Sequence, residues 1–148
     1  MGAVKAAPIL RRAVAGDAAA LAALAGELGY PTEPAELGWR LESLPSDDEV
    51  WVALVDGEVV GWIHCAVRRS LVVQPSIEIR GVVVGERWRH RGVGRKLMEL
   101  AERLATEHGL SAVRLRSGAQ RDGAHSFYRA LGYRELKTQR VFIRDLEE

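Results

Sequence analysis

The spacing of apolar residues changes its period along this chain, and the longest regular pattern lies between residues 77 and 105. Up to Val84 the residues are mostly β-branched and apolar, which is typical of a strand buried within a sheet. From Val93 onward the apolar residues recur at helical spacing, and Gly109 can end that helix. The pattern therefore predicts a buried strand, a polar loop and an amphipathic helix in succession.

The flanking segments predict further strands and helices around this unit. Upstream we expect a strand at 9–13, a helix beginning at Gly16-Asp17, a second helix with Thr32 as its N-cap, and strands at 49–55 and 58–67 joined by a tight turn at Asp56-Gly57. Downstream we expect a strand at 111–116 parallel to the central one, a helix at 124–131, and strands at 133–136 and 139–143. The order β-α-α-β-β-β-α-β-α-β-β predicts a single-domain α/β (α+β) fold, a mixed sheet with helices on both faces.

Composition narrows the class of protein. The chain has 148 residues, 47% of them hydrophobic and 28% charged, as is typical of one soluble globular domain. No apolar run reaches the length of a membrane span, and residues 1–12 lack the apolar core of a signal peptide, so we expect a cytoplasmic protein. The net charge of +1 gives no general affinity for nucleic acid, and no Cys/His spacing indicates a metal.

The loop between the central strand and the helix is rich in glycine and arginine. Gly92 and Gly94 stand at the expected helix start, where unpaired backbone N–H groups and the helix dipole favour an anion. Glycine lets a phosphate approach the backbone closely and adopts positive φ angles readily. The surrounding cations are Arg87, Arg89, Arg91, Arg95 and Lys96. The glycine spacing is neither that of a P-loop nor that of a dinucleotide-binding loop, so another kind of phosphate site is predicted.

Two segments carry a resemblance to a known family. Arg89-His90-Arg91-Gly92-Val93-Gly94 resembles the Gln/Arg-x-x-Gly-x-Gly/Ala loop of the GNAT superfamily of acyl-CoA-dependent N-acetyltransferases, and the segment from Ala124 to Tyr133 is similar to its Ala-x-x-Phe/Leu-Tyr-x-x-Leu-Gly-Phe/Tyr signature. The resemblance implies one N-acetyltransferase domain over 1–148. It implies that acetyl-CoA, as co-substrate, gives its acetyl group to the primary amine of a small molecule or peptide by direct attack in a ternary complex.

The same resemblance assigns roles to individual residues. Tyr128 is expected to protonate the departing CoA thiolate, with a core tyrosine as the alternative reading. Glu78 is expected to take the proton of the amine, with a salt bridge to Arg80 or a neighbouring strand as the alternative. The CoA-binding residues implied are Val82, Val83, Val84, Arg89, His90, Arg91, Gly92, Val93, Gly94, Arg95, Ser117, Ala124 and Tyr128. Gly81 is expected to mark a bulge that opens the sheet beside the pantetheine arm.

Several positions leave alternatives open. Arg121 stands where many relatives have an asparagine that binds the pantetheine arm, and Ser117 is a substitute for that contact. His64 either lines the acceptor pocket or is a satisfied core histidine, while Cys65 is interpreted as a core residue. Segments 30–44 and 136–140 are expected to flank the acceptor. The acidic residues Glu33, Glu36, Glu42, Asp47 and Asp48 favour a cationic amine, and a solvated helix face accounts for them equally well.

Two other functions compete with acetyl transfer. A non-catalytic acyl-CoA-binding sensor would use the same loop, although the presence of Tyr128 favours an enzyme. A nucleic-acid binder would use the arginine patch at 87–95, but the chain lacks interleaved aromatic residues there and its net charge is near zero. Because dimers are common in the family, a homodimer is one of the expected assemblies.

Overall fold

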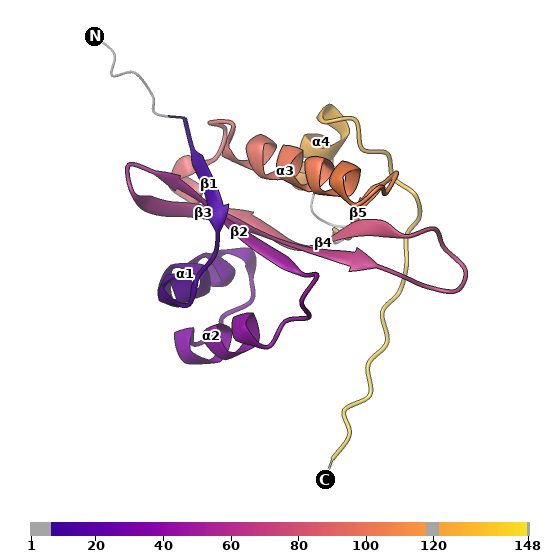
Figure 1. Ribbon diagram of the computed structural model, residues 1–148, viewed down its shortest axis with the longest axis horizontal. Helices are drawn as coiled ribbons and strands as arrows, with labels where there is room; N and C mark the ends of the chain where they lie inside the picture. The colour runs from indigo at the N-terminus through magenta and orange to yellow at the C-terminus, as the bar shows by residue number, and fades with distance from the viewer. Residues whose placement is uncertain (1–6, 118–121, 148) are drawn as a thin grey trace. The chain divides into compact units, whose positions relative to one another are not determined.

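The computed structural model describes residues 7–117 and 122–147. The chain forms two compact units, one that ends at Arg116 and one that begins at Ser117. The first unit holds the sheet, and the second holds one helix and the C-terminal segment (Figure 1). The predicted extent of a single domain, 1–148, remains a prediction.

The sheet of the first unit has the strand order β1-β2-β3-β4-β5 within the described residues. These strands are β1 (Ile9–Arg12), β2 (Glu49–Val55), β3 (Glu58–Arg68), β4 (Ser76–Val84) and β5 (Val113–Leu115). The first three pairs are antiparallel, and β4 pairs with β5 in parallel. The predicted mixed sheet is therefore confirmed, including the parallel strand that follows the central helix.

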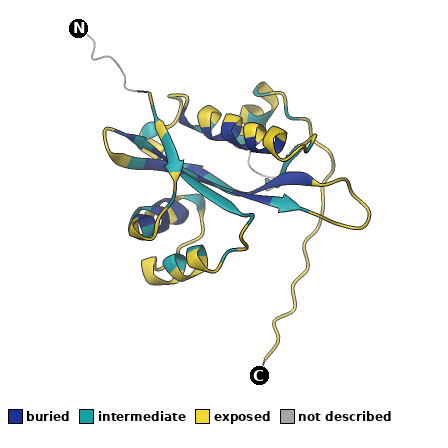
Figure 2. Cartoon of the chain, viewed as in Figure 1, coloured by how far each residue is buried: buried dark blue, intermediate teal, exposed yellow. Residues whose placement is uncertain are grey.

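Helices cover both faces of this sheet. On one face lie α1 (Ala18–Leu28) and α2 (Pro34–Glu42), and α3 (Val93–Glu107) covers the other (Figure 1). Buried residues gather where the sheet meets α1 and α3 (Figure 2). None of the described helices is long and apolar enough to cross a bilayer.

The apolar stripe of α3 packs on the sheet as its spacing predicts. Val93, Leu97, Leu100 and Leu104 are at most 5% exposed. Burying a leucine side chain is favourable by about 1.5–3 kcal/mol, so this face fixes α3 against β4 and β3. The position of the helix start at the end of β4 follows from that packing.

The β2–β3 hairpin turns at Asp56-Gly57, where both residues have positive φ angles of 50° and 79°. These angles match the type I′ turn that suits the twist of antiparallel strands, so the predicted hairpin is confirmed. The pairing of β3 with β4 shifts between His64 and Cys65, where Arg80 is the extra residue of β4. The predicted bulge at Gly81 is thus also confirmed, and a Cβ atom at Gly81 would come within 2.9 Å of the Trp62 ring.

Two local predictions are wrong. Residues 133–147 form no strand, although strands were predicted at 133–136 and 139–143. Strand formation needs a backbone partner as well as apolar side chains, and here Val141, Phe142 and Ile143 are 81–88% exposed. The N-cap of α2 is Glu33 rather than Thr32, because Pro34 occupies the first helical position, where its fixed φ angle suits the helix.

Asp17 fixes the connection from β1 to α1. Its carboxylate accepts hydrogen bonds of 2.8 and 2.9 Å from the Arg11 guanidinium and one of 2.8 Å from the backbone N–H of Val14. The hydrogen bonds from Arg11 lower the pKa of Asp17 from its ordinary value, although burial acts in the opposite direction. The carboxylate therefore stabilises the fold in its charged form.

We expect Asp17→Asn to lower the free energy of unfolding at neutral pH by about 1.5–3 kcal/mol, the usual range for a hydrogen bond to a charged group. Because the folded pKa is depressed, the stabilisation is complete above the unfolded pKa of about 4 and disappears as pH falls through the folded pKa. Urea unfolding of both proteins from neutral into acid pH measures this convergence. A difference that stays constant throughout the acid range would contradict it.

Candidate active site

The loop before α3 has a backbone shaped to receive an anion. It runs from the 3-10 turn η2 (Glu86–Trp88) to Gly92, which is the N-cap of α3 and has a φ angle of 84°. No side chain caps this end of the helix, and its first turn contains no acidic residue. The amides of the first turn therefore point outward without intrahelical partners, at the positive end of the helix dipole.

The space in front of Gly92 is open, since a Cβ atom built there would have no neighbour within 4 Å. His90 also has a positive φ angle, 63°, so the loop turns sharply twice before the helix begins. Arg89 donates a hydrogen bond of 3.1 Å from Nε to the Val84 carbonyl, and Arg91 lies 5.3 Å from the centre of the Trp88 ring. The hydrogen bond of Arg89 holds the loop against the end of β4, and the contact of Arg91 with Trp88 lies within the loop.

The cations of the loop remain largely available. Arg87, Arg89, Arg91, Arg95 and Lys96 are all exposed. Within the described ranges only Arg95 among them has a carboxylate partner, Glu99 at 4.0 Å. The residues predicted from the sequence thus assemble a positively charged, glycine-lined helix start, which suits a pyrophosphate.

One edge of β4 is left open within the first unit. β5 pairs with β4 only at Ile77, Glu78 and Ile79, so no strand lies beside Val82, Val83 and Val84 on that side. Of these three residues Val83 is buried and its two neighbours are half-buried. An extended ligand with amide groups could therefore pair with the backbone here, as a further strand would.

Glu78 is a buried carboxylate that forms an ion cluster with Arg68 and the half-exposed Arg80. Its side chain is 10% exposed, with Arg68 Nε at 3.4 Å from one carboxylate oxygen and Arg80 Nη1 at 3.3 Å from the other. The salt bridge that the sequence left open as an alternative is therefore present. Arg68 Nη1 and Ser76 Oγ are buried without a hydrogen-bond partner among the described residues, and Arg68 pairs with Ser76 in the strand register.

The second unit carries the remaining predicted residues. Tyr128 lies on α4 (Asp122–Ala130), and its ring makes edge contacts with those of Phe127 and Tyr133, at centroid distances of 5.3 and 6.3 Å. Ala124 is half-buried on the same helix, and Ser117 Oγ is buried without a described partner. Arg121 falls outside the described residues. The role of Tyr128 beside CoA remains a prediction.

The sequence missed one polar pair. His64 Nε2 lies 2.7 Å from Asp48 Oδ2, and the two side chains are 19% and 8% exposed. The residues are 16 positions apart, so no local spacing reveals them. Next to His64, burial raises the pKa of Cys65 to about 12, with smaller effects of Glu49 and Asp48. The thiol therefore stays protonated, and its interpretation as a core residue is confirmed.

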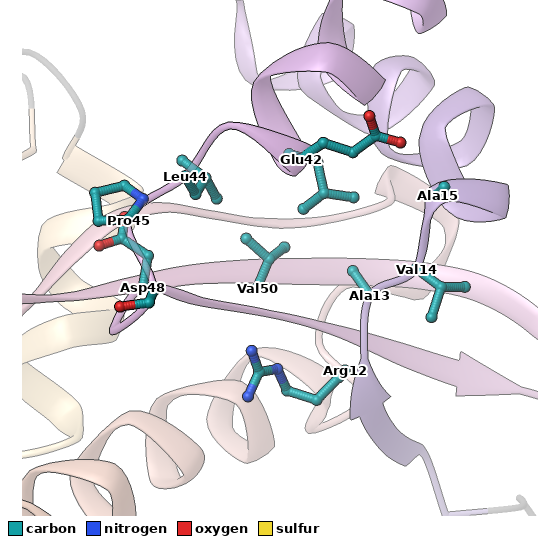
Figure 3. Close-up of a pocket in the computed structure, with 11 residues that line it drawn as sticks. Arg12, Ala13, Val14, Ala15, Glu42, Leu44, Pro45, Asp48 and Val50 are labelled. Carbon is teal, nitrogen blue, oxygen red and sulfur yellow. The ribbon is translucent and has the colours of Figure 1, made fainter.

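A cavity of about 330 Å³ lies between the end of β1, the α2–β2 connection and the start of β2 (Figure 3). Its lining includes Arg12, Glu42, Leu44, Asp48 and Val50. Another cavity, of about 400 Å³, lies beside α1 and the loop, against Glu27 and Trp88. Over residues 7–117 and 122–147, no three His, Cys, Asp or Glu side chains gather as metal ligands.

The sequence profile of the Acetyltransferase (GNAT) family matches residues 18–133. The chain belongs to the GNAT family. The match includes the basic loop, the open edge of β4 and α4, so the predicted resemblance is confirmed. Membership of GNAT supports acetyl transfer as the general activity and a CoA-based acyl donor as its general requirement.

Individual relatives agree with this family. An uncharacterized N-acetyltransferase of Chlorobaculum tepidum is 30% identical over 134 residues, which are 88% of this chain and 77% of that protein. Human N-acetylaspartate synthetase is 33% identical over 86 residues, or 58% of this chain, but only 28% of the human enzyme's length is spanned. An aminoglycoside N-acetyltransferase solved with CoA has a TM-score of 0.82 at 19% identity, covering 94% of this chain and 95% of that one, which shows the fold alone.

Gly92 of the basic loop has a matched control glycine, Gly109, for a test of ligand binding. Gly92 and Gly109 lie near opposite ends of α3, both have positive φ angles, and neither has a neighbour within 4 Å of a built Cβ. We expect Gly92→Ala and Gly109→Ala to lose similar stability, about 1–2 kcal/mol, because alanine is strained at such angles.

Only Gly92→Ala should also weaken CoA binding, by about tenfold or more, because its methyl group and altered backbone oppose the pyrophosphate. Isothermal calorimetry with CoA measures the affinities, and thermal unfolding measures the stabilities. Equal CoA affinity in the two variants would contradict the anion site at Gly92.

Proposed function

We propose that the protein is a cytoplasmic N-acetyltransferase that moves an acetyl group from acetyl-CoA to the primary amine of a small molecule or peptide, within a ternary complex. The observation that carries this proposal is the basic loop, whose left-handed Gly92 opens the first turn of α3 in a chain of the GNAT family. An anion-binding helix start suits the pyrophosphate of CoA.

The rest of the donor would follow the open edge of β4. The loop residues from Arg89 to Arg95 would hold the pyrophosphate, and the backbone of Val82, Val83 and Val84 would pair with the amides of pantetheine. A backbone N–H of the same stretch would hold the thioester oxygen as negative charge develops on it. The resemblance also assigns contacts with CoA to Ser117 and Ala124 of the second unit.

The chemistry requires three proton transfers to be managed. The acceptor arrives as an ammonium ion and loses one proton to become a nucleophile. Glu78 is the proposed acceptor of the amine's proton, through water. The nitrogen then attacks the thioester carbon and loses a second proton to solvent. The carbon–sulfur bond breaks, and Tyr128 donates its phenolic proton to the departing thiolate.

The identity of the acceptor is supported only as a broad class. The acidic residues of segment 33–48 are less available than their number suggests, since Glu36 pairs with Arg40, Asp47 with Arg69 and Asp48 with His64. The relatives compared above are named for aminoglycoside and aspartate acceptors, which differ in charge. We therefore leave the proposed acceptor as a primary amine of unspecified charge. We also propose a homodimer, which light scattering would test.

The decisive experiment incubates the purified protein with acetyl-CoA and a panel of polyamines, aminoglycosides, amino acids and short peptides. The measured quantity is CoA thiol released in the presence of each amine. Amine-dependent release supports the transferase. Release that no amine raises, together with stabilisation of the fold by acetyl-CoA, would favour the non-catalytic sensor instead.

Tyr128→Phe tests the proposed acid. We expect kcat to fall by about 100-fold while CoA affinity changes little, because the phenol acts only when the thiolate leaves. The matched control is Tyr133→Phe, which removes a hydroxyl from the neighbouring ring of the same aromatic group. Unchanged kcat in Tyr128→Phe would show that Tyr128 is not the acid.

Glu78→Gln tests the proposed base against a purely structural role. The substitution keeps the shape and removes the charge that faces Arg68 and Arg80, so both readings expect lower stability. A base role also lowers kcat of the folded enzyme at neutral pH, by about 10²-fold or more. If Glu78→Gln is less stable but keeps its kcat at low temperature, then Glu78 serves only to hold the ion cluster together.

A further inference from the structure

The strongest feature outside the proposed site is the buried pair of Asp48 and His64. The carboxylate oxygen lies 2.7 Å from the imidazole nitrogen, and only 8% of the Asp48 side chain is exposed to solvent. Burying a carboxylate and an imidazole costs free energy that one hydrogen bond offsets only in part. An apolar pair of similar volume would serve the sheet equally well, so the pair calls for a chemical explanation.

The pairing determines which nitrogen of His64 can accept a proton. An ionised carboxylate only accepts hydrogen bonds, so Nε2 must carry the hydrogen that points to Asp48. In a neutral imidazole the lone pair then lies on Nδ1. Across residues 7–117 and 122–147, Asp48 is the one hydrogen-bond partner of this ring. The pairing thus fixes the tautomer and leaves Nδ1 as a proton acceptor, and no hydrogen-bond donor among the described residues contacts it.

His64 lies on the face of the sheet covered by α1 and α2. Trp62, two residues away on β3, donates a hydrogen bond of 3.2 Å from Nε1 to the Leu21 carbonyl of α1, and side chains two apart in a strand point to the same face. In the register, His64 stands opposite Gly81, directly after the bulge. That is the point where β4 leaves β5 and its open edge begins.

The cavity of Figure 3 includes one member of the pair, Asp48, while His64 is not among the residues that line it. Asp48 and Val50 line it, and Val50 is the register partner of His64 on β2. Arg12, which also lines the cavity, pairs with Glu49 at 3.2 Å on the face of the sheet opposite His64, so its charge does not offset that of Asp48. An ammonium group that enters along Leu44 and Val50 would therefore be attracted toward Asp48 and His64.

We propose that His64, oriented by Asp48, takes the first proton from the ammonium group of the acceptor before attack. This inference rests on the proposed acetyl transfer and adds a residue to it. An N–H bond of the ammonium breaks, the proton passes to Nδ1, and the freed lone pair attacks the thioester carbon. The imidazolium later releases this proton to solvent. His64 is the catalytic residue in this step, and Asp48 is a positioning residue.

The resemblance assigns the amine's proton to Glu78, but each oxygen of Glu78 faces an arginine, which makes it less suited to this first proton. With His64 as the first base, Glu78 would take the proton that is lost after attack. The other charged residues on the face of His64 include Arg68 on its own strand and Glu78 on β4, since Glu78 pairs in register with Ala66. Arg80 is the extra residue of the bulge beside Gly81, and Glu42 lines the cavity. Glu49 of β2 pairs in register with Cys65, so it points to the opposite face. The buried face of α1 contributes only leucine and alanine. Asp48 is therefore the nearest charge that orients the ring.

The test measures kcat/KM as a function of pH for the wild type and for His64→Gln, with an amine that the acceptor panel identifies. At neutral pH we expect a loss of about 100-fold, the range of general base catalysis. As the pH rises toward about 10, where a lysine-like amine loses its own proton, the variant should recover toward the wild type. Glu78→Gln should show no such recovery, because its proton is lost only after attack.

Three controls separate chemistry from structure. His108→Gln changes an exposed histidine at the C-terminal end of α3 and should leave the pH profile unaltered. Added imidazole should raise the rate of His64→Ala at neutral pH and leave that of the wild type unchanged. Asp48→Asn should lose most of the neutral-pH rate without imidazole rescue, since the amide can hold the wrong tautomer. Thermal unfolding and CoA titration establish that each variant is folded.

The outcomes distinguish the two proposals. If the wild type releases no CoA with any amine, the proposed transferase fails and the role of His64 falls with it. If the wild type is active and His64→Gln retains kcat/KM within about threefold at neutral pH, only the role of His64 is overturned. The same holds if His64→Gln loses activity equally at every pH and imidazole does not raise the rate of His64→Ala, because a structural defect would then explain the loss.

Discussion

Backbone groups without partners are the constraint on which the candidate site depends. The N–H groups in the first turn of α3 have no carbonyl of a preceding turn to donate to. Beyond the end of β5, β4 continues with one edge unpaired. Packing fixes both features, because the buried stripe of α3 places its first turn at the end of the strand. A ligand that carries a phosphate at one end and amides along its length satisfies both sets of groups together.

The bulge at Gly81 connects this edge with the opposite face of the sheet. The extra residue of β4 changes the direction of the strand just after its last pair with β5, and the Trp62 ring fills the space that a side chain would need. The donor side and the face that carries His64 therefore meet at one short stretch of backbone. A substitution at Gly81 would disturb both sides together.

Regular local patterns made most of the first unit predictable. The stripe of α3, the turn at Asp56-Gly57 and the glycine of the bulge each have a signature within a few residues. The C-terminal strands were not predictable, since Phe142 and Ile143 have strand-like composition but strand formation depends on a partner elsewhere. The pair of Asp48 and His64 was missed for a related reason: it exists only once β2 and β3 are aligned, which spacing along the chain does not reveal.

The burial of Cys65 makes the only cysteine of the chain a reporter of its integrity. A thiol that stays protonated at the centre of β3 reacts with an alkylating or disulfide reagent only when the sheet opens. The rate of its modification thus measures how often the core is exposed under native conditions. The same protection leaves released CoA as the thiol that such a reagent detects, so one chemical signal reports turnover on a short timescale and unfolding on a long one.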